Sequence, residues 1–152
     1  MHGDYIKMRG SIEMARHNAI DGSIVEKRHI KNTVVTAGRR HILELIRSGG
    51  LTTVFDNAAF GTSTTAPATS DTALGSEAVR KTIASFDTAN LTSNPPSWAA
   101  QVTLATNEGN TTLGEAGLLN SSSAGTLLNR ATFATIDKTT SNTLAVTFTI
   151  SG

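Results

Sequence analysis

The sequence contains no cysteine among its 152 residues. This absence excludes disulfide bonds, thiolate zinc sites and cysteine nucleophiles. Other catalytic patterns are also missing: the twelve acidic residues are scattered, and neither a P-loop nor a G-x-S-x-G sequence occurs. The histidines form no pair with zinc-binding spacing; they are His2, His17, His29 and His41. We therefore expect no enzyme activity, no cofactor and no metal site.

Charged and aromatic residues are scarce. They make up 16% and 5% of the chain, with a single tryptophan and a single tyrosine. The net charge of +1 supplies no field that would hold nucleic acid, and the basic residues are not interleaved with aromatic side chains. No stretch approaches the roughly 18 apolar residues of a membrane span, and no signal-like apolar run opens the chain. We expect a protein made in a cytoplasm that binds neither nucleic acid nor membranes.

The charges are unevenly distributed along the chain. Residues 1–50 carry nine Lys/Arg and five Asp/Glu, a net of +4, and the remaining residues carry four and seven, a net of −3. This distribution is either a chance spread over a solvated surface or a basis for attraction between neighbouring copies.

Threonine, serine, asparagine, alanine and glycine are abundant. Threonine suits half-exposed strands, and Ser, Asn and Gly suit turns. Together with period-two alternation of apolar residues, this composition predicts an all-β protein, an antiparallel β-sandwich or related barrel. Residues 1–33 are expected to form an N-terminal hairpin or arm, and residues 34–152 the β-sandwich domain, within one compact unit. The predicted strands cover residues 6–14, 24–33, 54–60, 78–86, 98–105, 113–119, 127–136 and 144–150.

One short helix is predicted over about residues 36–48. Thr36 is its expected cap, and Gly49-Gly50 ends it. The apolar residues of this segment are spaced to share one face, which consists of Ile42, Leu43 and Ile46 with Leu45 at its edge.

The segment from Phe60 to Lys81 is too polar for a core and has no catalytic cluster. We expect an ordered loop, pinned by Pro67 and by Asp71, which can cap a turn around residues 72–75. Such a loop is either a surface that packs against a neighbour or a plain crossover between two sheets. Farther along, Glu115 stands between two glycines, where we expect it to bind backbone amides at a bend in a strand.

Three segments in this order resemble structural proteins of tailed bacteriophages. They are IKNTVVTAGRRHILELI (30–46), AAFGTSTTAPATSDTALGSEAVRK (58–81) and LGEAGLLNSSSAGTLLNRATFATIDKTTSNTLAVTFTI (113–150). One departure from the family pattern is Ser63, where glycine is commoner. The resemblance implies a virion structural protein, made in a bacterial host cytoplasm, of the head or of the tail.

The small size and the absence of a catalytic set favour a capsid decoration or cement protein, with the major capsid protein and copies of itself, as a homotrimer, for partners. The N-terminal arm and the polar loop are the expected contact regions, because an arm adds interface area to a small domain. Deleting residues 1–16 is then expected to abolish assembly but leave a folded domain. The predicted interface residues are Ile6, Met8, Ile12, Met14, Thr62, Thr64, Thr65 and Pro67.

Two alternatives remain open at the level of sequence. A collar, baseplate or fibre-base subunit of the tail, with other tail proteins as partners, fits the resemblance equally well. A carbohydrate-binding β-sandwich is the other alternative, with Trp98 as a sugar platform. The regular alternation that begins at Trp98 favours a core position for this side chain instead.

Overall fold

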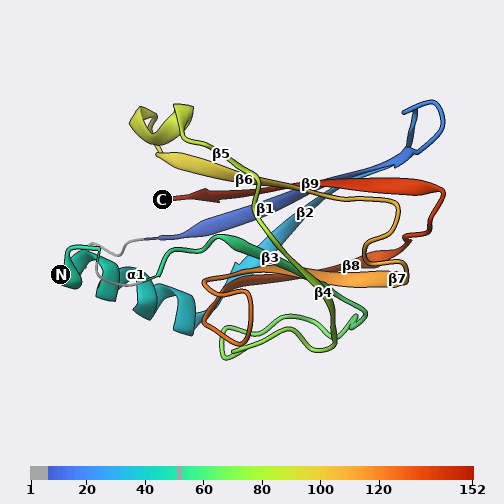
Figure 1. The fold of residues 1–152 in the computed structure, drawn as a ribbon. Coiled ribbons are helices and arrows are strands. Elements are labelled where there is room, and N and C mark those ends of the chain that lie inside the picture. The colour runs from blue at the N-terminus through green and yellow to red at the C-terminus, as the bar shows by residue number, and fades with distance from the viewer. Residues whose placement is uncertain (1–6, 51–52) are drawn as a thin grey trace.

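The computed structural model describes residues 7–50 and 53–152. Within them, nine antiparallel strands form one sheet in the order β4-β3-β7-β8-β2-β1-β9-β6-β5 (Figure 1). The prediction of an all-β fold with one short α-helix is confirmed. The elements are β1 (Arg9–Asn18), β2 (Ile24–Val34), α1 (Thr36–Ser48), β3 (Asn57–Gly61), β4 (Glu77–Thr82), β5 (Ser85–Asp87), the 3-10 helix η1 (Ala89–Thr92), β6 (Ser97–Leu104), β7 (Thr112–Leu119), β8 (Leu127–Asp137) and β9 (Asn142–Ser151).

The sheet curls into two layers that face each other, as in a β-sandwich. Strand β2 makes the bend, because it pairs with β1 along most of its length and with β8 only at Thr33 and Val34. At the two ends of the strand order, β4 and β5 are joined through Ile83 and Ala84 alone. The chain crosses there from the layer of β3, β7 and β8 to the layer of β1, β9 and β6 (Figure 1). The predicted single strand over residues 78–86 is therefore wrong, since its two halves belong to different layers.

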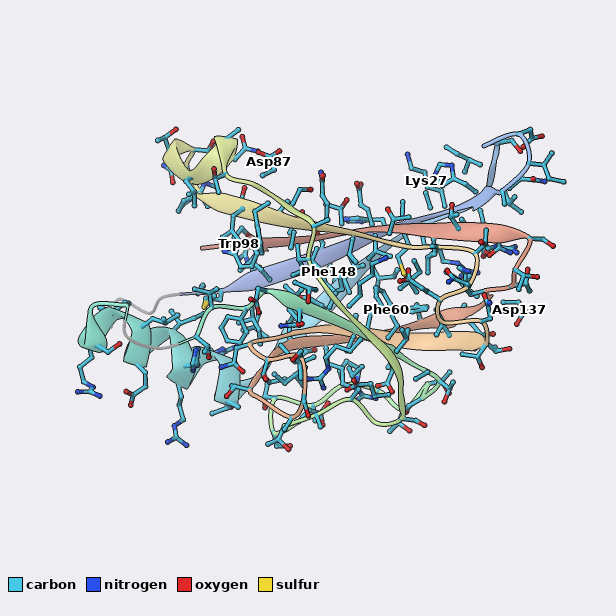
Figure 2. The ribbon with its side chains drawn as sticks, in the orientation of Figure 1. Lys27, Phe60, Asp87, Trp98, Asp137 and Phe148 are labelled. Carbon is cyan, nitrogen blue, oxygen red and sulfur yellow. The ribbon has the colours of Figure 1, made fainter. Side chains whose placement is uncertain are left out.

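Inward-facing side chains of both layers form the main core. Along β9 every second residue is buried, as the alternation from Leu144 to Ile150 predicts. Phe60 of β3 and Phe148 of β9 meet between the layers, with ring centroids 6.3 Å apart (Figure 2). Burying each large apolar side chain of this kind contributes roughly 1.5–3 kcal/mol to folding.

The N-terminal hairpin forms as predicted, and it lies in the interior of the sheet. Ile12 of β1 stands opposite Ile30 of β2, and Asp21 shapes the turn by accepting a 2.9 Å hydrogen bond from the Ser23 amide. Strand β1 also pairs along its full ten residues with β9. The hairpin is therefore built into the same sheet as the rest of the chain.

Helix α1 has the predicted bounds but different contacts. Its N-cap position is Val35, and no side chain caps it, so the predicted cap by Thr36 is wrong. The helix lies at one end of the sandwich (Figure 1), so only one side of it can reach the core. Ile42 packs against the core, whereas Leu43 and Ile46 are exposed, so these three residues do not share one buried face.

Candidate functional site

The threonine-rich loop, residues 62–76, lies against the outer face of the layer that contains β3, β7 and β8 (Figure 1). Leu74 is the buried apolar residue of the loop, and it joins a small second core on that face. The rest of this core comes from the sheet and the start of α1; its buried members are Val35, Ala59, Leu119 and Leu127. Both faces of this layer are thus covered, which explains why β7 is buried along nearly its whole length.

A charged cluster of Asp71, Glu115 and Arg130 holds the threonine-rich loop to the sheet; Glu115 and Arg130 are buried and Asp71 is half-buried. Glu115 is fully buried on β7 and accepts hydrogen bonds from the backbone amides of Gly75 (2.9 Å) and Ser76 (2.6 Å). The predicted role of Glu115 as an acceptor for backbone amides is confirmed. The amides belong to the threonine-rich loop, 39 and 40 residues earlier in the chain.

Arg130 of β8 links the other members of the charged cluster. Its Nε donates to Glu115 Oε2 at 2.8 Å and its Nη1 to Asp71 Oδ2 at 2.9 Å. Its Nη2 donates to the carbonyl oxygen of Thr65 at 3.1 Å. The guanidinium therefore contacts both the first half and the second half of the loop.

The ionisation of the charged cluster follows from these contacts. Partial burial raises the pKa of Asp71, but the Ala68 amide and the Arg130 guanidinium outweigh it, so that the pKa lies below its ordinary value. For Arg130, burial lowers the pKa, and the bonds to Glu115 and Asp71 raise it above its ordinary value overall. The carboxylates and the guanidinium bind one another and the loop backbone. This arrangement is suited to the structural role of holding the loop on the sheet.

The predicted contact residues of the loop lie at the surface. Thr62, Thr64 and Thr65 are exposed, and Pro67 is half-buried. Backbone groups of the loop are used internally, as in the 2.9 Å bond from the Thr62 amide to the Ser76 carbonyl. The threonine side chains are therefore presented outward from a fixed backbone, and their contact with a partner stays a prediction.

The N-terminal residues that were predicted to form an interface differ in their burial. Ile6 lies outside the described residues, and Met8 is half-buried. Ile12 and Met14 are 0% and 1% exposed and belong to the main core, where β1 lies between β2 and β9. Their alternation reflects packing against the opposite layer of the same chain, which corrects the hypothesis that they form an exposed contact row.

An apolar end of the molecule, defined by the exposed residues Leu43, Ile46, Val54, Phe86 and Leu91, was not predicted from the sequence. An open pocket of about 470 Å³ lies there between α1 on one side and β5, η1 and β6 on the other. All of its lining side chains but Thr88 are apolar. Trp98 is half-buried at this pocket and packs against the core and against Phe86, with ring centroids 6.0 Å apart. Helical spacing in α1 is the one signal that pointed to this surface.

A metal-binding cluster and a membrane-spanning helix are both absent from residues 7–50 and 53–152. In these ranges no three His, Asp or Glu side chains gather where a metal ion could be held. The helices described there are too short or too polar to cross a membrane. Comparison of the chain with protein-family models, curated proteins and solved structures finds no match.

Proposed function

We propose that this chain is a structural subunit of a tailed-phage virion, and specifically a capsid decoration or cement protein. The observation that supports the proposal is the charged cluster. Its members come from the second and third of the segments that resemble phage structural proteins, and together they fix a hydroxyl-rich loop on the outside of the sandwich. The role of these three residues in this chain would be to hold a contact surface in place.

The cement role follows from what the loop offers a neighbouring surface. Exposed threonine side chains on a fixed backbone provide hydrogen-bonding groups and methyl groups without a net charge. A protein contact of standard size buries about 800 Å² on each partner, and a rigid loop loses little conformational entropy when it forms. The proposed partners are the major capsid protein and further copies of this chain. No catalytic step is part of the proposal.

Immunogold electron microscopy of intact virions, with an antibody against this chain, tests the location. Label scattered over the head is the expected result. Label confined to the tail would instead make the chain a collar, baseplate or fibre-base subunit. Absence of the chain from purified virions by mass spectrometry would refute a virion role altogether.

A binding experiment tests the loop directly. Purified chain is added to capsids that lack it, and bound protein is measured after sedimentation. The double variant Thr62→Lys with Thr65→Lys places positive charge on the proposed contact surface. It is expected to reduce the amount of chain bound to the capsids at least tenfold. Lysine at Thr135 and Thr140, which are also exposed, is the matched control. Equal occupancy for both double variants would exclude the loop as the contact surface.

A further inference from the structure

The apolar end has two sides that differ in structure. Helix α1 contributes Leu43 and Ile46, which are 58% and 68% exposed. Across the pocket, β5 and η1 contribute Phe86 and Leu91, which are 46% and 51% exposed, and Val54 is 60% exposed. Five of the eight large apolar side chains that are exposed in the described residues therefore belong to the elements around this pocket; Val54, Phe86 and Leu91 line it, whereas α1 lines it through Ile42 and Leu45, the chain neighbours of Leu43 and Ile46. The other three are Ile20, Ile24 and Val25, at the tip of the β1–β2 hairpin.

We propose that the apolar end is a contact between copies of this chain, in which α1 of one copy packs against β5 and η1 of the next. The inference rests on the proposed function for its biological meaning, since it names one of the surfaces through which a virion subunit would assemble. Its physical basis is the area and charge of the surface itself.

The area matches what a stable contact requires. With roughly 175 Å² for each fully exposed side chain, which is near the lower end of the range for aromatic side chains, the exposed fractions of the five residues correspond to about 500 Å² of apolar surface. One partner's share of a standard interface is about 800 Å², of which about 60% is apolar, so its apolar share is also about 500 Å². Exposed apolar patches of this size are often functional.

The charges of the two sides complement each other. Helix α1 presents exposed Arg39, Arg40 and Arg47, of which Arg47 is paired with Glu44, the single acidic residue of the helix, at 2.9 Å. The opposite side presents exposed Asp87, which lies beside η1 (Figure 2). Both sides lie at the same end of the molecule (Figure 1). In a dimer with a two-fold axis, the contact between α1 and β5 with η1 therefore occurs twice. In a larger cyclic assembly, each copy makes this contact once with the next copy.

Sedimentation velocity of the purified full chain tests the proposal without virions. Interfaces of standard size have Kd values from micromolar to picomolar, so we expect association well below about 100 μM. Ile46→Gln on α1 and Leu91→Gln on η1 are each expected to raise Kd at least tenfold. Ile20→Gln, at a side chain that is 95% exposed on the hairpin tip, is the matched control and should leave Kd unchanged. Leu43→Gln replaces Ile46→Gln if the latter lowers the melting temperature.

The outcomes separate this inference from the proposed function. A wild-type chain that stays monomeric at about 100 μM overturns the contact, even where gold label on virions supports the virion role. Association that the apolar-end variants leave intact, or that Ile20→Gln weakens equally, also overturns it. Asp87→Asn keeps the acceptor for the Ala89 amide but removes the charge, so it should reduce the salt dependence of Kd. An unchanged salt dependence would exclude the charged part of the contact.

Discussion

Replacing Arg130 by methionine is expected to destabilise the protein strongly, because the arginine compensates a fully buried carboxylate. Arg130 is 3% exposed and Glu115 0%. Removing one partner of a buried ion pair costs about 3–5 kcal/mol. The amides of Gly75 and Ser76 still stabilise the Glu115 charge after the substitution, so the lower end of that range, about 3 kcal/mol, is expected. Methionine keeps the apolar stem of the side chain, so the loss reports on the guanidinium.

The free energy of unfolding is measured by urea denaturation, with the fluorescence of the single tryptophan, Trp98, as the signal. For a chain of this length, a loss of about 3 kcal/mol corresponds to a fall of about 6–12 °C in Tm. Arg47→Met is the matched control. Its salt bridge to Glu44 joins side chains that are 75% and 51% exposed, and such pairs contribute about 1 kcal/mol or less.

Two results would refute this reasoning. One is a loss below about 1 kcal/mol for Arg130→Met, and the other is a loss equal to that of Arg47→Met. The double variant Arg130→Met with Glu115→Gln sharpens the test, since it removes the two buried charges and leaves only the half-buried Asp71 carboxylate. Its loss should be smaller than the sum of the two single losses, because no uncompensated charge remains in the core.

Three further predictions follow from the structure. Gly38→Ala should cost about 1–3 kcal/mol in urea denaturation, because the new Cβ would lie 2.6 Å from the Cα and carbonyl oxygen of Leu128; an unchanged midpoint would contradict the close packing of α1 on β8. Deleting residues 1–16 should abolish the cooperative melting transition seen by circular dichroism, since it leaves β2 and β9 without the strand between them; a folded truncated chain would restore the arm hypothesis. The free energy of unfolding should be constant near neutral pH and fall below about pH 4. The pKa values of Asp71 and Glu108 lie below their ordinary 3.8 and 4.5, so the stability that these carboxylates contribute is lost as they become protonated. A free energy of unfolding that rises on acidification would show the sign to be wrong.

The sequence predicted those parts of the fold that depend on local pattern. Period-two alternation located β6 and β9, and Asp21-Gly22 located the turn of the hairpin. The alternation of Ile12 and Met14 was also detected, but alternation shows only that one face of a strand is covered. It does not show whether the cover is the same chain or a partner, and this ambiguity produced the arm hypothesis.

The parts that could not be predicted depend on contacts between distant residues. Strands β4 and β5 are separated by two residues, so nothing local shows that they belong to different layers. The spacing in α1 located an apolar face, but only the position of the helix at the end of the sandwich determines that Leu43 and Ile46 stay exposed. Within the charged cluster, Glu115 was singled out from its flanking glycines, whereas Arg130, 15 residues away, carried no such signal.

The rigidity of the threonine-rich loop connects stability with the proposed role. Residues 62–76 between β3 and β4 are held by side chains of β7 and β8 through the charged cluster, together with backbone bonds such as that from Thr62 to Ser76. A free loop of this length would lose conformational entropy on docking, at a cost that weakens binding. Because the charged cluster already orders the loop during folding, this conformational entropy is lost before binding. The exposed threonines therefore hold their positions before a partner binds. Arg130 would therefore affect partner binding without touching the partner, as a positioning residue for the surface that the loop presents.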